Sequence, residues 1–213
     1  MFNFIFLHRN WEVDRMKFGR RLTRLAFGNA PFTLIIFPEG TTICPETMTK
    51  SRNYAEKMGL ANLDHVLVPR VTGMQFALNT LGEEIGGIFD LTIGYSGTLP
   101  SVAPEETYKL GSLFLEGKGP SRIHVHVKYY PISQIPYKHP EEFSRWLYDR
   151  FADKDRLMKY FYRNGHFQGA KSRAQPVAPR HSMFIIILAA AISTVILCAG
   201  VAFIFAYLQS CYT

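Results

Sequence analysis

The sequence predicts an α/β fold followed by a single membrane-spanning helix. Predicted strands alternate along the chain with segments of helical periodicity. This order is typical of a mostly parallel or mixed sheet flanked by helices. After about residue 170 a basic, proline-containing stretch leads into an unbroken apolar run. Of the 213 residues, we therefore assign 1–168 to one domain, 169–182 to a basic linker and 183–208 to a membrane span.

Three short apolar runs in the first half of the chain predict strands. They suit strands that are buried on both faces, because helices cover both sides of a parallel sheet. The runs are Phe2–Leu7, Thr33–Phe37 and Val66–Val68. The second run ends at Pro38 and Gly40, which stop a strand and open a loop.

Helical segments separate these strands. Asn10–Ala26 places apolar residues on one face and Arg20, Arg21 and Arg24 largely off it. These arginines indicate either a solvated or a membrane-facing surface. Thr47–Met58 predicts a second helix, which Gly59 ends, and Met74–Leu81 predicts one or two further helical turns.

The second half predicts two strands and a long helix. The strands are Phe89–Tyr95 and Arg122–Tyr130, and the helix is Pro140–Arg163. In the second strand apolar and polar residues alternate, so one face is expected to be buried and the other polar. The expected buried residues are Ile123, Val125, Val127 and Tyr129, and the expected polar residues are Arg122, His124, His126 and Lys128.

The segment Met183–Leu208 contains no charged residue and exceeds the roughly 20 apolar residues that cross a bilayer. Basic residues precede it, whereas the five residues after it carry no side-chain charge. Because positive charge stays on the cytosolic side, we expect a single-pass protein with a cytosolic domain.

The net charge of +7 is compatible with a nucleic acid, an anionic membrane or a phosphorylated ligand. No nucleic-acid-binding motif is recognisable, and the membrane span favours lipid headgroups. The three cysteines have neither a metal-binding spacing nor a disulfide pattern. His124 and His126 share a strand face, where a solvated pair is the expectation and a metal pair the alternative.

The sequence FPEGTT, Phe37–Thr42, places a carboxylate, a glycine and two hydroxyls directly after a predicted strand. In α/β folds such loops commonly bind ligands. Two further blocks flank it in order, FIFLHRNW at Phe4–Trp11 and LVPRVTG at Leu67–Gly73. Together with SRNYAEKMGL, IFDLTIGY and RIHVHVKYYPI, these blocks resemble the glycerolipid acyltransferases, in the lysophosphatidate and lysocardiolipin acyltransferase branch.

The resemblance covers nearly all of residues 2–168 and implies roles for individual residues. Arg9 would contact the substrate phosphate, for which the guanidinium donors are well matched. Pro69 would shape the acyl-CoA side of the pocket, and Arg70 is a further candidate for binding the anion. The glycerol-phosphate moiety would be held by Glu39, Gly40 and Thr41.

Two departures from the family pattern stand out. Many members have an arginine after the Glu-Gly-Thr triplet, whereas this chain has Thr42, for which Lys50 or Arg52 are possible substitutes. The family's catalytic block is Asn-His, four residues and then Asp, in which the aspartate orients the histidine as a general base. No histidine of this chain has an aspartate five positions later, so no catalytic residue is assigned. Because the family's catalytic block would precede Phe2–Leu7, Met1 resembles an internal methionine.

The resemblance implies transfer of a fatty acyl group from acyl-CoA, a co-substrate, to a lysophospholipid of the 1-acylglycerol-3-phosphate type, without a bound cofactor or metal. It further implies the endoplasmic reticulum membrane, with the mitochondrial surface as the alternative. The competing interpretations are a catalytically inactive, tail-anchored phospholipid-binding paralogue and a fragment of an active enzyme.

Overall fold

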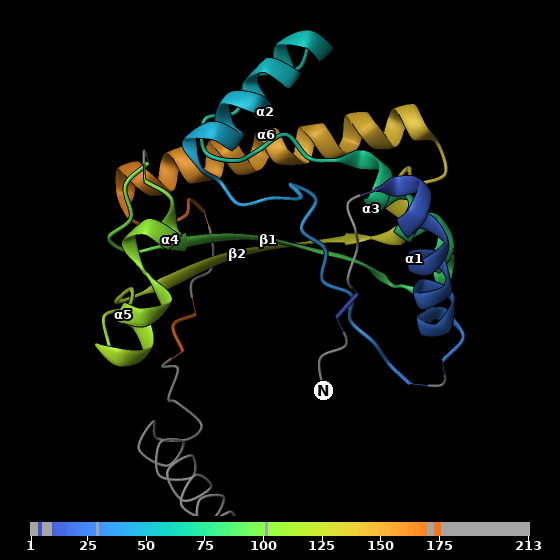
Figure 1. Cartoon of the computed structure of the whole chain (residues 1–213), viewed down its shortest axis with the longest axis horizontal. Helices are drawn as coiled ribbons and strands as arrows, with labels where there is room; N and C mark the ends of the chain where they lie inside the picture. The colour runs from blue at the N-terminus through green and yellow to red at the C-terminus, as the bar shows by residue number, and fades with distance from the viewer. Residues whose placement is uncertain (1–3, 6–9, 29, 101, 170–172, 176–213) are drawn as a thin grey trace, which may run out of the picture. The chain divides into compact units, whose positions relative to one another are not determined.

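A computed structural model describes residues 4–5, 10–28, 30–100, 102–169 and 173–175. Residues Met1–Ala170 form one compact unit, to which the following description refers. Its described elements are helices and one small two-stranded sheet (Figure 1). The predicted combination of helices and a sheet is therefore confirmed. The described sheet is antiparallel, not the mostly parallel or mixed sheet that was predicted.

Helices α1 (Trp11–Ala26) and α3 (Val71–Leu81) pack side by side (Figure 1). The predicted first helix is confirmed, and Asn10 caps it by accepting a 3.1 Å hydrogen bond from the amide of Glu12. The third helix begins three residues before the predicted Met74. Between the two helices lies an apolar cluster of Phe18, Leu22, Ala26, Ala77 and Leu81.

The sheet has two antiparallel strands, β1 (Gly87–Tyr95) and β2 (Ile123–Pro131). Both strands were predicted from their sequence. The register pairs Gly87 with Pro131 and Tyr95 with Ile123. The connection between them contains the short helices α4 (Pro104–Thr107) and α5 (Leu110–Leu115), and 3₁₀ turns at Gly82–Glu84 and Ile132–Gln134 flank the sheet.

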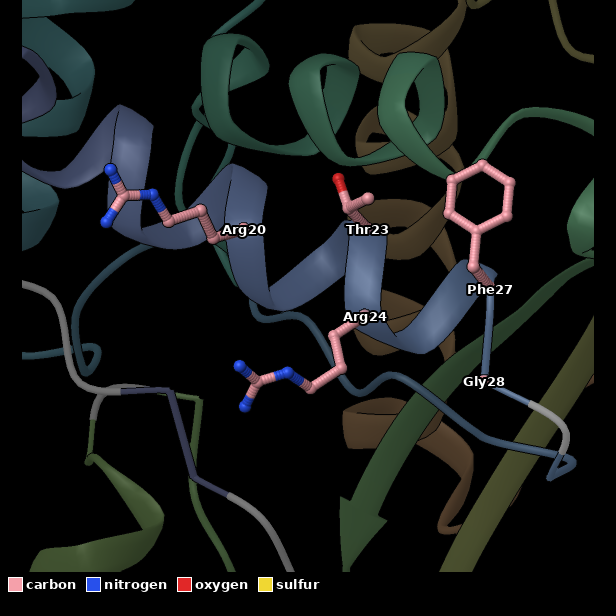
Figure 2. A pocket seen from close by; sticks show the side chains of 5 residues that line it. All are labelled: Arg20, Thr23, Arg24, Phe27 and Gly28. Carbon is pink, nitrogen blue, oxygen red and sulfur yellow. The ribbon is translucent and has the colours of Figure 1, made fainter.

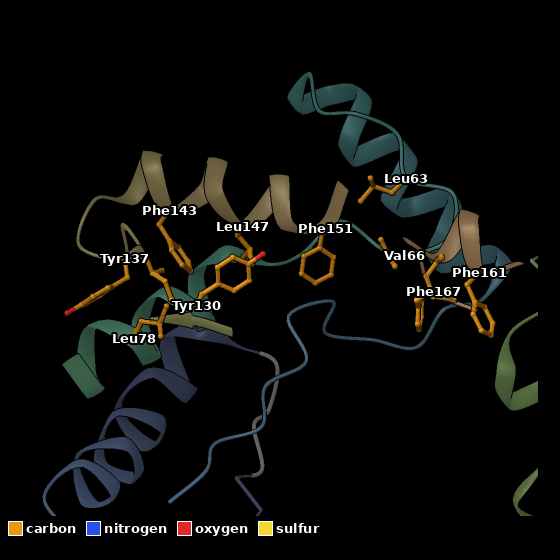
Figure 3. Close-up of a cluster of buried hydrophobic side chains, with 12 residues drawn as sticks. Leu63, Val66, Leu78, Tyr130, Tyr137, Phe143, Leu147, Phe151, Phe161 and Phe167 are labelled. Atoms are coloured by element: carbon orange, nitrogen blue, oxygen red, sulfur yellow. The ribbon is translucent and has the colours of Figure 1, made fainter. Parts of the chain in front are cut away.

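The long helix α6 (Pro140–Asn164) packs on one face of the sheet and builds the larger core (Figure 3). Its buried stripe follows helical spacing, and it ends at Gly165 in the left-handed conformation with φ +74°. The stripe consists of Phe143, Leu147, Phe151, Met158 and Phe161.

The predicted orientation of β2 is wrong. Its apolar residues Ile123, Val125, Val127 and Tyr129 are about half exposed, and β1 adds Phe89, Leu91 and Ile93 to the same outer face. The reason is that α6 and the segment after it cover the opposite face, where Phe161 of α6 and Phe167 meet polar residues of the strands. His124 lies 5.3 Å from Phe161 and His126 lies 5.8 Å from Phe167, measured between ring centroids.

Two predicted strands do not form. In the segment 32–37, Phe32, Leu34 and Ile36 pack inward while Ile35 and Phe37 are exposed, which is the side-chain period of a strand. The segment nevertheless pairs with no described strand, and neither does Val66–Val68. Of the predicted strand Phe2–Leu7 only Phe4 and Ile5 are described, and they are not in a strand.

Helix α2 (Pro45–Met58) begins two residues before the predicted Thr47, because proline suits the first helical position. It ends at Gly59, as predicted, in the left-handed conformation with φ +64°. Its only buried residue is Ala55, so α2 is largely exposed to solvent.

The predicted linker and membrane span are mostly not described: residues 176–213, which include Met183–Leu208, lie outside the described part of the chain. Among the helices that are described, none has both the length and the apolar character that a bilayer crossing requires.

Candidate functional site

The loop after the segment 32–37 is a tight turn that needs glycine. The amide of Gly40 donates a 3.1 Å hydrogen bond to the carbonyl of Phe37, and Gly40 has φ +72°. Side chains other than that of glycine rarely adopt this backbone conformation. The Phe37–Gly40 turn therefore presents Glu39 and exposed backbone at one point of the surface.

Three contacts join this turn to the Leu67–Arg70 segment, which precedes α3. The amide of Arg70 donates to the carbonyl of Pro38 at 2.8 Å, and the amide of Leu67 donates to Glu39 Oε2 at 3.2 Å. The Arg70 side chain also lies against Gly40, since a Cβ atom added there would be 3.1 Å from Arg70 Cδ. The structure thus brings together two of the three motif blocks.

The site residues differ in exposure. Gly40, Thr41 and Arg70 are exposed, Glu39 is half-buried and Pro69 is buried. Arg70 also stands at the N-cap of α3, where the helix dipole adds positive potential. The fourth predicted contact, Arg9, lies outside the described residues.

Burial raises the pKa of the Glu39 carboxyl above its ordinary 4.5, which the amide of Leu67 and the charge of Lys154 partly offset. The carboxylate has a structural task. By accepting the Leu67 hydrogen bond it fastens the turn to the neighbouring segment.

Lys154 and Asp90 were not identified from the sequence. The Lys154 ammonium forms a salt bridge with Asp90 and donates to the carbonyl of Leu91 at 2.7 Å and to the hydroxyl of Thr92 at 3.2 Å. Its side chain is 11% exposed. The available signal was an aspartate inside the apolar strand IFDLTIGY, because a charge there requires a partner.

Two further side chains hold the chain between residues 64 and 70. Ser51 of α2 accepts a 2.8 Å hydrogen bond from the amide of Val68. Asp155 of α6 accepts hydrogen bonds from the amides of Asp64 at 2.8 Å and His65 at 2.6 Å. No local pattern in the sequence indicated these contacts.

The two cations suggested as substitutes for the family arginine are already bound by carboxylates. Lys50 pairs with Glu46, and Arg52 pairs with Asp64 at 3.1 Å. Both pairs are exposed and therefore weak, so a phosphate would compete for either cation at small cost.

Among the described histidines, none has a carboxylate bonded to its ring. His124 Nε2 lies 3.4 Å from the hydroxyl of Ser96, His166 Nδ1 lies 2.9 Å from the carbonyl of Asn164, and His65 Nδ1 is buried without a partner. His124 and His126 are half-buried, so the expected solvated face is wrong. Within the described residues no three potential metal ligands converge.

Gly40→Ala is expected to lower the free energy of unfolding by about 1–2 kcal/mol, since the left-handed backbone disfavours any Cβ. Urea denaturation of the full chain in non-ionic detergent, followed by tryptophan fluorescence, measures it. Gly73→Ala is the matched control, because an added Cβ meets nothing within 4 Å and alanine favours the helix by up to about 1 kcal/mol. Equal effects at both positions would contradict the assignment of the turn.

Comparison with known proteins identifies the family. The family described as Acyltransferase C-terminus matches residues 113–189. The chain is 34% identical to the 2-acyl-1-lysophosphatidylinositol acyltransferase of Saccharomyces cerevisiae over 78% of its length, and 37% identical to lysophosphatidylinositol acyltransferase 10 of Caenorhabditis elegans over 75%. It is also 35% identical to lysocardiolipin acyltransferase 1 of Gallus gallus over 76%. The chain belongs to the glycerolipid acyltransferase family.

The chain spans half or less of the length of these family relatives. It covers 50% of the Saccharomyces cerevisiae protein, 39% of the Caenorhabditis elegans protein and 41% of the Gallus gallus protein. No solved structure matches it. The family match at residues 113–189 begins near the end of α5 and includes β2 and α6. Glu39 and Arg70 lie outside that match, so their roles depend on the motif resemblance and on the contacts described above.

Proposed function

We propose that this chain forms the acceptor-binding part of an O-acyltransferase that moves a fatty acyl group from acyl-CoA to a lysophospholipid. The observation that carries the proposal is the contact between the Phe37–Gly40 turn and Arg70, which stands at the N-cap of α3. The names of the relatives support a lysophospholipid acceptor, since they specify lysophosphatidylinositol and lysocardiolipin.

Arg70 is proposed to bind the phosphate of the acceptor. Its guanidinium is exposed beside Gly40, which has no side chain to obstruct a ligand, and the N-terminus of α3 favours an anion there. Arg9 is proposed as a second phosphate contact on the resemblance alone. Thr41, which is exposed next to the turn, offers a hydroxyl to the glycerol.

Glu39 is proposed to position the turn and to accept a hydrogen bond from the glycerol moiety with its second carboxylate oxygen. Pro69, which is buried, is proposed to shape the acyl-CoA side through packing and not through polar contact. In the reaction, an acceptor hydroxyl attacks the thioester carbonyl, a carbon–oxygen bond forms and the carbon–sulfur bond to coenzyme A breaks.

The attacking hydroxyl must lose its proton to a base, which in the family is a histidine followed five positions later by an aspartate. No histidine among the 213 residues has that spacing. Because a missing acid/base group costs about 10²–10⁴ in rate, we assign this chain to binding and not to proton transfer.

Binding of fluorescent lysophosphatidate to the full chain in detergent micelles tests the site. Arg70→Gln is expected to weaken binding about 10-fold or more, because a hydrogen bond to a charged group is lost. Arg145→Gln, which removes another exposed guanidinium, in this case from α6, is the matched control and should leave affinity unchanged. Unchanged affinity in Arg70→Gln would refute the site.

Acyl transfer from radiolabelled acyl-CoA by the same preparation separates two functions. Binding without turnover is expected here, both for a fragment of an active enzyme and for the alternative, a catalytically inactive phospholipid-binding paralogue. Turnover well above the uncatalysed rate would contradict the assignment to binding alone.

We further propose that residues 183–208 anchor the protein in the endoplasmic reticulum membrane with residues 1–168 in the cytosol. The uncharged apolar run and the basic residues before it support this topology. A glycosylation acceptor placed after Thr213 should be modified, and a tag that stays unmodified would contradict the orientation.

A further inference from the structure

The outer face of α1 carries a cluster of cations opposite its buried side. Phe18 and Leu22 pack against α3, and at 100° per residue the residues three or four positions apart on the far side align in a second stripe. We call this stripe the basic face. Its cations are Lys17, Arg20, Arg21 and Arg24.

No described carboxylate neutralises the basic face. None of its four cations takes part in an ion pair within the described part of the chain, whereas the cations Lys50, Arg52 and Lys154 all do. Like charges four positions apart, such as Arg20 and Arg24, repel each other and slightly destabilise the helix. A surface that keeps this repulsion is complementary to an external anion.

Apolar side chains are interspersed among these cations. Val13 is 58%, Met16 is 65% and Phe27 is 77% exposed, although all three occupy the same side of the helix as the cations. Figure 2 shows the side chains of Arg20 and Arg24 extending from α1, with Phe27 at the C-terminal end of the helix. Solvent exposure of large apolar groups costs free energy unless a partner covers them.

Two shallow hollows run along this face, and their lining combines both kinds of residue. One is lined by Arg20, Thr23, Arg24, Phe27 and Gly28. The other includes Val13, Met16 and Lys17. Neither is lined by Glu39 or Arg70, so the face is separate from the site described above.

We propose that the basic face docks α1 onto the surface of a bilayer that contains anionic phospholipids. The four cations engage headgroup phosphates, while Val13, Met16 and Phe27 enter the boundary between headgroups and acyl chains. A helix with basic and apolar residues on its free side has the composition of an interfacial helix. A soluble polyanion such as a nucleic acid would satisfy the cations but leave the apolar groups exposed. The inference does not depend on the acyltransferase activity.

A local probe tests this contact, because sedimentation with vesicles would not separate it from anchoring by residues 183–208. Cys44, Cys198 and Cys211 are changed to serine, Met16→Cys is labelled with bimane, and the full chain is reconstituted into phosphatidylcholine vesicles that carry a quencher-labelled lipid. Met58→Cys on α2 is the matched control, since that methionine is also exposed, at 53%.

Quenching at position 16 is expected when phosphatidylserine is added to the vesicles, with little change at position 58. Arg20→Gln/Arg24→Gln should weaken docking about 25-fold, because each cation near an anionic surface contributes about a fivefold factor. Arg20→Glu/Arg24→Glu should weaken it further, and 0.5 M salt should weaken the native contact through screening. Circular dichroism checks that the variants keep their helical content.

Equal quenching at positions 16 and 58, or quenching at 16 that ignores both anionic lipid and the arginine substitutions, would overturn the proposal. A change in bimane emission on adding polynucleotide but not on adding anionic vesicles would overturn it in favour of a nucleic acid. Because these readouts do not involve lysolipid affinity, either proposal can fail while the other stands.

Discussion

Lys154→Met is expected to lower the free energy of unfolding by about 3 kcal/mol. The substitution removes the partner of Asp90 in a largely buried salt bridge, and an unpaired charge in such a position is strongly destabilising. It also removes the donor that bonds Leu91 and Thr92 and so ties α6 to β1. Urea denaturation in non-ionic detergent, followed by tryptophan fluorescence, measures the change.

Two controls define the cause. Lys159→Met removes an exposed ammonium from the same helix and should change stability by less than about 0.5 kcal/mol. Asp90→Asn/Lys154→Met removes both charges and should recover part of the loss, because no unpaired ion remains. A Lys154→Met protein as stable as Lys159→Met would contradict the importance of the salt bridge.

Lys154→Met should also change how the stability of the protein depends on pH, because Lys154 lowers the pKa of Glu39. The Glu39 pKa is already raised in the folded state, so the folded protein binds a proton that the unfolded chain has lost above about pH 4.5, and this contribution to stability disappears as pH rises. Without the positive charge of Lys154 the pKa of Glu39 should rise further. The free energy of unfolding should then keep falling to a higher pH in Lys154→Met than in the unchanged protein. Adding Glu39→Gln should remove this difference between the two pH profiles.

Phe143→Ala is expected to lower the free energy of unfolding by about 3–5 kcal/mol, which is a large part of the stability of a domain this size. Phe143 is fully buried in the larger core (Figure 3). It also stacks on Trp146, with ring centroids 5.8 Å apart. Truncation of its side chain leaves a cavity near the N-terminal end of α6. The loss should appear as a lower urea midpoint.

The matched control for Phe143 is Phe89→Ala, because Phe89 is a phenylalanine that is 67% exposed on the outer face of β1. Its loss should cost much less, since little apolar surface returns to water. A comparable cost at both positions would mean that the outer face of the sheet is covered in the protein under test.

Local signals predicted the helices α1, α2, α3 and α6, whereas the short helices α4 and α5 were not predicted. The caps at Asn10 and Gly59 and the stripe of α6 depend on residues at most a few positions apart, so the sequence contains the whole of their cause. The strands β1 and β2 were also predicted from their composition and alternation. Their pairing was not, because the energy of a ladder depends on which distant strand supplies the hydrogen bonds.

The candidate site divides in the same way. The motif FPEGTT and the need for glycine at position 40 were visible in the sequence, and they indicated a turn with a carboxylate. The contact between Glu39 and Leu67, the placement of Arg70 against Gly40 and the support from Ser51 and Asp155 were not visible. These contacts join residues whose separation along the chain carries no periodic signal.

The sequence by itself determined the four longer helices, the two strands, the tight turn and the family, since each depends on local preference or on ordered motifs. The tertiary structure decided which face of the sheet is covered. Alternation in β2 indicates that its two faces differ, but the packing of α6 on one of them selects the buried face. On that face Asp90 forms a salt bridge with Lys154, and His124 and His126 contact the rings of Phe161 and Phe167. Because these polar residues have partners, they can occupy a covered face that apolar residues usually take.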